Sequence, residues 1–155
     1  MPNHDKPFQR KGSISNSHVG REFELAAQAF WQSQGLRLKH GIKMSIGIDF
    51  RKTKEHAFDL GCREQKVIVE CKTHKWTSGG NVPSAKMTKW NEAMYYFVAA
   101  PSGLRKIMFV LRDFCTKHNC TLAEYYIKTN YHLIPDDVEF WEYDDETKTA
   151  RKLKT

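Results

Sequence analysis

The amino-acid sequence predicts an α/β fold in which helices pack against one mixed sheet. Several segments repeat apolar residues at steps of three and four, the pattern of a helix with one buried face. Other segments alternate apolar and polar residues or are rich in β-branched residues, the pattern of strands. Because the two kinds of segment follow one another along the chain, a layered α/β arrangement is expected. The chain has 155 residues, 40% of them hydrophobic, which is enough for one domain with its own core.

Three helices are predicted. The first covers about residues 18–33, with Ser17 as its N-cap and Gly35 just beyond its C-terminus. Its apolar stripe consists of Val19, Phe23, Ala26, Ala27, Phe30 and Trp31. The second helix covers about 85–99 after an N-cap at Ser84, with a stripe of Met87, Trp90, Met94 and Phe97, and the third covers about 122–130. Because Trp31 and Trp90 lie on these stripes, we expect both rings in the core.

The clearest strand runs from Val67 to Cys71, where β-branched residues follow one another as in a strand covered on both faces. A turn at 61–65 leads into it, and residues 105–111 read as another buried strand. These two segments should lie in the middle of the sheet.

The remaining strand signals are weaker. Mixed alternation over residues 36–60 indicates strands with turns near Gly41 and around 51–55, so that two or three strands in all precede the second helix. Residues 138–143 alternate well enough for an edge strand, and the acidic turn and basic tail that follow are expected to be solvated.

Residues 1–16 lack apolar periodicity and are expected to form a flexible arm, while residues 17–155 form one domain. No run approaches the roughly 18 apolar residues of a membrane helix, and the N-terminus lacks the apolar stretch of a secretory signal. We therefore expect a cytoplasmic protein whose four cysteines are thiols. Cys115, His118 and Cys120 lie close together, but their spacing matches none of the paired zinc motifs.

The positive charge of the chain is concentrated in its middle. The net charge is +7, and residues 51–112 hold twelve basic and five acidic residues, whereas residues 113–155 hold six and nine. A localised basic surface favours a polyanionic partner, of which nucleic acid is the commonest.

Strand alternation predicts that three charged residues meet. Glu70 and Lys72 share a face of their strand, because side chains two residues apart point the same way. In the preceding strand, Phe58 and Leu60 are expected to share one face and Asp59 to occupy the other. If the core faces of the two strands align, Asp59 joins Glu70 and Lys72.

Two carboxylates beside a buried sheet are costly unless a partner compensates their charge. A divalent cation, Mg²⁺ or Mn²⁺, would do so, because it takes a few carboxylate oxygens and keeps several waters. Such an ion could polarise a phosphodiester and lower the pKa of a water, while Lys72 orients that water or offsets charge on the phosphorus. The alternative is an ordinary salt-bridged hairpin.

Asp59 followed by Glu70-Cys71-Lys72 resembles the catalytic signature of the PD-(D/E)xK nuclease superfamily, whose restriction-endonuclease-like core has the order αβββαβ. The elements predicted for residues 17–112 follow that order, and residues 113–155 would form a C-terminal αβ appendage. Phe58 stands where family members often have proline. The segment Gly20-Arg-Glu-Phe23-Glu24 also resembles the first helix of modification-dependent restriction enzymes and archaeal Holliday-junction resolvases.

The resemblance implies a catalytic set made up of Asp59, Glu70, Lys72 and Glu24. Asp59 and Glu70 would ligate the metal together with the Cys71 carbonyl, and Lys72 would orient the attacking water. The helix glutamate of the family faces the metal site. Glu24 is the first choice for it and Glu22 the alternative, because a helical phase inferred from one sequence can be off by a residue.

The loop after Lys72 mixes basic, aromatic and glycine residues, which suits contact with phosphates and bases. The predicted nucleic-acid contacts are His74, Lys75, Trp76 and Asn81 in this loop and Lys86 and Lys89 on the next helix. A plain mobile loop and a solvated helix face are the alternatives. His56 is expected to be structural or exposed.

Together these observations predict a Mg²⁺- or Mn²⁺-dependent nuclease, most directly a deoxyribonuclease. A nucleic-acid-binding or accessory protein without catalysis on the same fold is the main alternative, and an interaction protein whose charge is incidental is a weaker one. A small nuclease that cuts both strands is often a dimer, so a homodimer is a further expectation.

Overall fold

The computed structural model describes residues 16–155, so the arm expected at residues 1–16 lies outside the described residues apart from its last position. The helices are α1 (Asn16–Ser33), α2 (Ser84–Ala99), α3 (Leu122–Asn130) and the short 3₁₀ helix η1 (Tyr131–Leu133). The strands are β1 (Lys39–Ile46), β2 (Lys54–Cys62), β3 (Val67–Lys72), β4 (Arg105–Leu111), β5 (Phe114–Cys115), β6 (Cys120–Thr121), β7 (Val138–Asp144) and β8 (Thr149–Leu153). In this part of the chain no helix is both long and apolar enough to cross a membrane.

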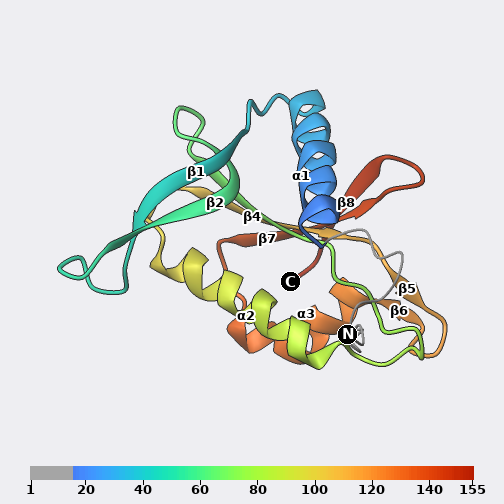
Figure 1. Cartoon of the computed structure of the whole chain (residues 1–155). Coiled ribbons are helices and arrows are strands. Elements are labelled where there is room, and N and C mark those ends of the chain that lie inside the picture. Colours follow the sequence, from blue (N-terminus) through green and yellow to red (C-terminus); the bar gives the residue numbers. More distant parts are fainter. Residues whose placement is uncertain (1–15) are drawn as a thin grey trace, which may run out of the picture.

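Six strands form one mixed sheet in the order β1-β2-β3-β4-β7-β8, and β5 and β6 form a separate short hairpin (Figure 1). Neighbours from β1 to β3 are antiparallel, β3, β4 and β7 are parallel, and β8 returns antiparallel to β7. Each parallel step needs a crossover, which α2 and α3 provide. The predicted α/β class and the order of helix, three strands, helix and strand are therefore confirmed.

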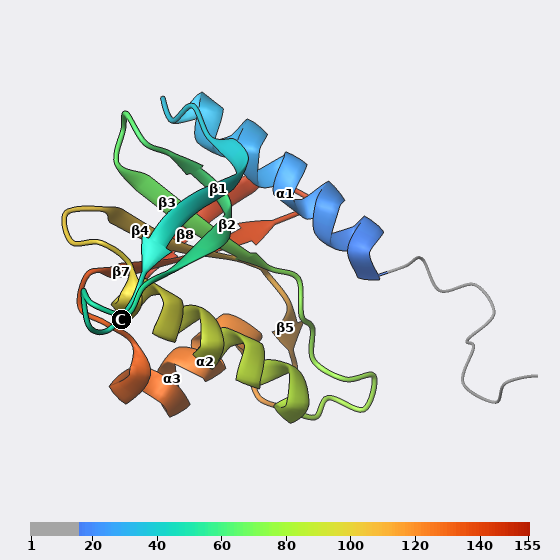
Figure 2. The ribbon, with the colours of Figure 1, turned by 60° about the vertical axis from the view of Figure 1, so that its left-hand side comes forward.

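Helices cover both faces of the sheet, with α1 on one face and α2 and α3 on the other (Figure 2). Trp31 of α1 is 1% exposed and Trp90 of α2 is fully buried, which confirms that both rings belong to the core. Strand β3 serves both layers, because Val67 and Val69 pack on the α1 side and Ile68 packs on the α2 side. The continuous apolar run of this strand follows from that double covering.

The β1–β2 hairpin is twisted at Gly41 and Asp59, so that its buried side chains face one side of the sheet before this point and the other side after it. On one side of this point, Leu60 packs in the α1 cluster, and on the other side Phe58 packs in the α2 cluster. Gly41 has a φ of +63°, and the cross-strand register pairs the residues on either side of it but not Gly41 with Asp59. The expectation that Phe58 and Leu60 share a face is wrong, because this twist breaks the two-residue alternation. The expectation of a turn near Gly41 is also wrong, because Gly41 is an interior position of β1.

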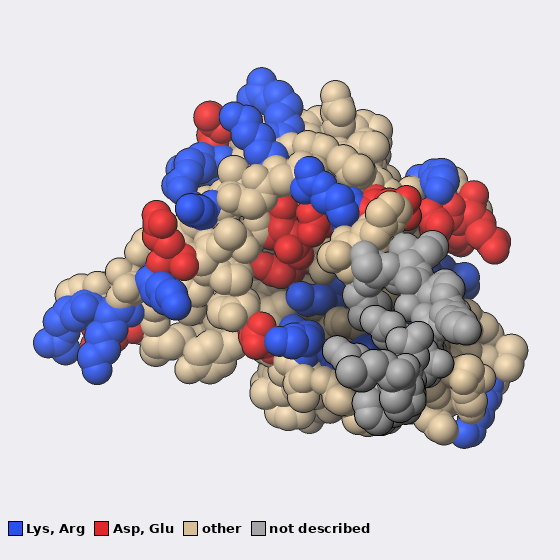
Figure 3. Space-filling view, viewed as in Figure 1, with Lys and Arg blue, Asp and Glu red and all other residues tan. Residues whose placement is uncertain are grey.

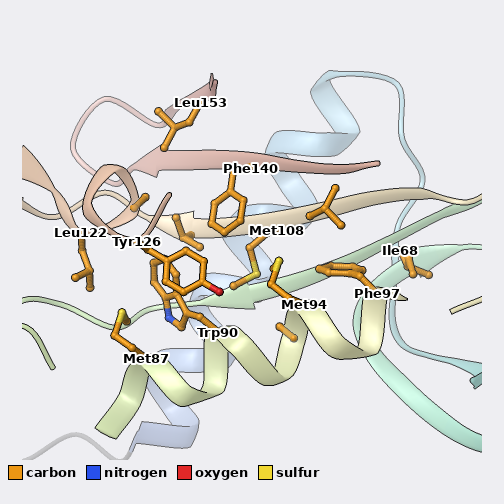
Figure 4. Close-up of a cluster of buried hydrophobic side chains, with 14 of the residues drawn as sticks. Ile68, Met87, Trp90, Met94, Phe97, Met108, Leu122, Tyr126, Phe140 and Leu153 are labelled. Carbon is orange, nitrogen blue, oxygen red and sulfur yellow. The ribbon is translucent and has the colours of Figure 1, made fainter. Parts of the chain in front are cut away.

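The C-terminal segment adds two strands to the sheet and one helix to its α2 side. Tyr126 of α3 and Phe140 of β7 contact Trp90, with ring centroids 5.1 and 6.3 Å from the indole (Figure 4). The prediction of an edge strand at 138–143 is wrong, because β8 pairs with β7 and takes the edge. The charged tail forms this strand because Arg151 and Lys152 pair with carboxylates of β7.

Neither serine predicted as an N-cap has that position. Helix α1 begins at Asn16, which places Ser17 inside its first turn, and α2 begins at Ser84 after an N-cap position occupied by Pro83. The predicted end of α1 is confirmed, because Gly35 has a φ of +88°, the left-handed conformation that terminates helices.

The twist of the β1–β2 hairpin at Gly41 and Asp59 predicts a specific role for Gly41. Gly41→Ala should lower the free energy of unfolding by about 1–2 kcal/mol, because a left-handed φ costs other residues that much. A Cβ at this position meets nothing within 4 Å, so the loss would come from the backbone and not from a clash. Gly20→Ala in α1, also without a close neighbour, should instead raise the free energy of unfolding by about 0.5–1 kcal/mol. Urea unfolding would measure both, and equal responses would contradict the role assigned to Gly41.

Candidate active site

Asp59 lies where β2 separates from β3. The ladder between these strands ends at Leu60 and Val69, so Asp59 does not continue it opposite Glu70. Its Oδ2 accepts the backbone N–H of Cys71 at 2.8 Å instead. The carboxyl group thereby satisfies a β3 donor that the ladder leaves free, as a buried backbone group requires.

The pKa of the Asp59 carboxyl is raised from 3.8 to about 7, first by burial and then by the negative charge of Glu70. Glu24 adds to this increase, while the Cys71 N–H and the charge of Lys72 oppose it. In the metal-free protein near neutral pH, Asp59 is therefore divided between its protonated and ionised forms. A buried carboxyl with such a pKa beside a second acid is typical of functional sites.

Glu70 is the more deeply buried acid, with an exposed fraction of 5%. One carboxylate oxygen lies 3.3 Å from His56 Nε2 and the other 3.6 Å from Lys72 Nζ. The His56 ring stacks on Tyr96 of α2, with centroids 3.9 Å apart. The structure thus places Asp59, Glu70 and Lys72 in one neighbourhood, as predicted, and adds His56 as a positioned partner of Glu70.

The available donors fit a hard divalent cation. Asp59 and Glu70 supply carboxylate oxygens, and the Cys71 carbonyl is a further candidate, which is the oxygen chemistry that Mg²⁺ and Mn²⁺ prefer. Among residues 16–155, no group of three or more His, Cys, Asp or Glu side chains is placed to hold a metal ion. A cation bound here would therefore depend on two carboxylates, backbone oxygen and water.

The Cys71 thiol is not suited to be a ligand itself. Its burial, reinforced by the negative charge of Asp59 and Glu24, raises its pKa well above 9.0. The thiol therefore stays protonated at neutral pH, whereas metal ligation requires a thiolate.

Helix α1 presents Glu24 toward the site and Glu22 away from it. Glu24 is half-buried and contributes to the raised pKa of Asp59, whereas Glu22 is exposed and lies 3.6 Å from His18. One oxygen of Glu24 lies 3.2 Å from His40 Nδ1 and 3.6 Å from Arg21. This helical phase selects Glu24 over the alternative for any role beside Asp59.

The loop after β3 is anchored by its aromatic residue. Trp76 is 8% exposed, and its backbone N–H and indole N–H both donate to Asp113, at 2.8 and 3.0 Å. The ring stacks on His118, with centroids 4.5 Å apart, and His118 Nε2 lies 2.9 Å from the Gly80 carbonyl. This packing covers most of the indole and fixes its position at the wall of a groove, and contact of Trp76 with nucleic acid stays a prediction.

His74 is fixed by a hydrogen bond to the buried Trp90. Its Nδ1 accepts the indole N–H of Trp90 at 2.8 Å, so the neutral ring carries its proton on Nε2. Burial and then the positive charges of Lys72 and Lys86 lower the pKa of His74 below 6.5. His74 is therefore a neutral group at pH 7, able to donate from Nε2.

A groove of about 890 Å³ runs beside His74, between the loop, the start of α2 and Val19 of α1. Of the predicted nucleic-acid contacts, it is lined by His74, Lys75, Trp76 and Lys86. Asn81 lies outside it and accepts a hydrogen bond from Lys117, and Lys89 pairs with Glu92 at 3.7 Å. In Figure 3, acidic side chains gather between α1 and α2, with Lys and Arg around them.

The sequence predicted no partner for two histidines of this region, His40 and His56. His56 contacts Glu70, and His40 links Glu24 to Gln28 through its two ring nitrogens, at 3.2 and 3.1 Å. Neither contact leaves a signal in one sequence, because each joins elements whose register only the folded sheet determines.

Comparisons with models of protein families, with curated proteins and with solved structures find no match to this chain. The resemblance to PD-(D/E)xK nucleases therefore stays a prediction from the motif and the order of elements.

The raised pKa of Asp59 predicts how stability depends on pH. Its folded pKa of about 7 lies above the value of 3.8 for an unperturbed aspartate, so the folded state binds more protons between about pH 4 and 7 and loses stability as pH rises through that window. Asp59→Asn should therefore raise the free energy of unfolding by roughly 1–4 kcal/mol at pH 8, and by less at pH 5. Asparagine cannot ionise but keeps an oxygen for the Cys71 N–H.

Urea unfolding in the absence of metal at pH 5 and pH 8 would measure this difference. The exposed Asp136→Asn serves as the matched control and should keep the pH dependence of the unsubstituted protein. If Asp59→Asn keeps it as well, the raised pKa is wrong.

Proposed function

We propose that this protein is a metal-dependent nuclease that hydrolyses phosphodiester bonds, with DNA as its substrate. The observation that carries the proposal is Asp59, a half-buried acid with a pKa of about 7, beside Lys72 and the buried Glu70 where β2 leaves β3. A structural salt bridge needs one acid and one base. The second buried carboxylate adds repulsion that a bound cation would remove.

In this proposal, Asp59, Glu70 and the Cys71 carbonyl hold Mg²⁺ or Mn²⁺. The bound ion would polarise the phosphodiester and lower the pKa of a nucleophilic water. Lys72, whose ammonium lies 3.6 Å from Glu70, orients that water and offsets the charge that develops on the phosphate. His56 of the neighbouring strand β2 contacts the Glu70 carboxylate and fixes its position.

Two further features support a nucleic-acid substrate. The excess positive charge of residues 51–112 lies in the segment that carries the site. The groove beside it brings Lys75, Lys86 and the donor on His74 to one channel, which suits a phosphate backbone. Glu24 would contact the water around the cation from α1, because it already influences Asp59 electrostatically.

Lys72→Ala should reduce the rate of DNA cleavage about 10²–10³-fold, because it removes a charge that stabilises the transition state. Cleavage of plasmid and of single-stranded DNA in Mg²⁺ would measure this loss, and EDTA should abolish the activity of the unsubstituted protein. Lys128→Ala, an exposed lysine on α3, is the matched control and should cleave at the original rate.

Unchanged cleavage by Lys72→Ala would contradict the assignment of Lys72. A protein that binds DNA, cleaves it with neither metal and produces no heat on titration with Mn²⁺ would be a non-catalytic binding protein instead.

A further inference from the structure

The β1–β2 hairpin continues past the twist at Gly41 and Asp59 and extends beyond the rest of the molecule (Figure 1). Its tip, residues 47–53, joins the two strands. Two apolar side chains of the tip point into solvent, with Ile48 64% exposed and Phe50 90% exposed. Phe50 is thus a nearly free aromatic ring at the end of a projecting arm.

The tip is a built turn and not a loose connection. The Gly47 N–H donates to the Ala99 carbonyl at the end of α2, at 2.9 Å, which ties the base of the tip to the helix. Within the tip, the backbone N–H groups of Lys52 and Arg51 donate to the carbonyl and carboxylate of Asp49, both at 2.9 Å. A Cβ on Gly47 would collide with the Lys52 carbonyl, so only glycine allows the strands to cross this closely.

The charge of this arm favours a polyanion. Four exposed cations lie on its outer half, namely Lys43, Arg51, Lys52 and Lys54. Two acids, Asp49 and Glu55, accompany them, and Asp49 is already engaged by Arg51. Figure 3 shows Lys and Arg at the end of the arm, on the same face as the acidic side chains between α1 and α2.

Phe50 and Arg51 form a composite surface, because the guanidinium carbon lies 5.9 Å from the centre of the Phe50 ring. A cation next to an open aromatic ring is suited to a nucleic acid, where the cation meets a phosphate and the ring stacks on a base or wedges between bases. A protein partner would more often bury a wider apolar surface that is depleted in lysine, whereas Lys43, Lys52 and Lys54 lie on this arm.

We propose that the tip of the β1–β2 hairpin is a second DNA-binding element, separate from the groove beside His74. This inference rests on the proposed function, since it assumes that DNA is the substrate. Five residues separate Asp59 from Lys54, about 17 Å at the rise of a strand. With about 3.4 Å for each base-pair step, an arm that lies along the duplex would place the tip, which begins beyond Lys54, more than about five base pairs from the cleaved bond.

The test is binding of a fluorescein-labelled 30-base-pair duplex in EDTA, where no cleavage interferes. Arg51→Ala with Lys52→Ala should weaken binding about tenfold and reduce the slope of log affinity against log salt by about two, because two phosphate contacts are lost. Phe50→Ala should weaken binding about tenfold without changing that slope, because an apolar ring wedged between base pairs releases no counterions.

Two matched controls accompany these variants. The double variant Lys128→Ala with Lys154→Ala removes two exposed lysines elsewhere, and Tyr131→Ala removes an aromatic ring that is 71% exposed. Both should bind DNA as the unsubstituted protein does, which separates the role of the arm from a general loss of charge or aromatic surface.

Tip variants that bind DNA like the unsubstituted protein would overturn this inference and leave the proposed function intact. Tip variants that keep DNA binding but change the sedimenting mass would assign the tip to a protein contact and also overturn it. If the unsubstituted protein binds no DNA at all, the proposed substrate fails, and the inference fails with it.

Discussion

The twist of the β1–β2 hairpin at Gly41 and Asp59 is the constraint on which the rest of the structure depends. A regular hairpin would bury one face along its whole length. Here the inner half packs with α1, through Leu60, and the outer half packs with α2, through Phe58. The twist ends the β2–β3 ladder early, and the Asp59 carboxylate takes over a backbone hydrogen bond at the opening. The same local distortion therefore separates the strands, buries an acid and projects the outer hairpin away from the sheet.

Burying two acids at this opening requires compensation, and the surrounding elements provide only part of it. Glu70 is compensated by Lys72 from its own strand and by His56 from β2. Asp59 receives one backbone hydrogen bond and remains the acid whose ionised form is disfavoured, with a pKa of about 7. An uncompensated buried charge is destabilising in a purely structural hairpin but is useful where a cation binds. The proposed metal site follows from this imbalance.

Aromatic residues near the site anchor its loops. The exposed ammonium groups of Lys75 and Lys86 line the groove and face solvent. Trp90 donates to His74, and Trp76 is fixed by Asp113 and His118, so both indoles hold the segments that flank the groove. Lys75 and Lys86 stay at the surface, because burying an ammonium without a partner is costly, whereas the half-buried Lys72 has Glu70 as its partner. Phe50 differs from these aromatic rings, since it has no core to enter and lies at the end of the hairpin.

The sequence alone determined the α/β class, the three helices, the central strands and the shared face of Glu70 and Lys72, because each depends on local periodicity and spacing. The place of Asp59 beside them depends on the twist of the β1–β2 hairpin, which breaks the alternation expected for Phe58 and Leu60. Only the tertiary structure decided that Phe58 and Leu60 face opposite sides, that residues 149–153 form the edge strand, and that Trp76 is buried. The same holds for the partners His56 and His40. These features depend on contacts between elements far apart in the chain, where a twist, a cross-strand ion pair or a packed ring overrides the pattern of its own segment.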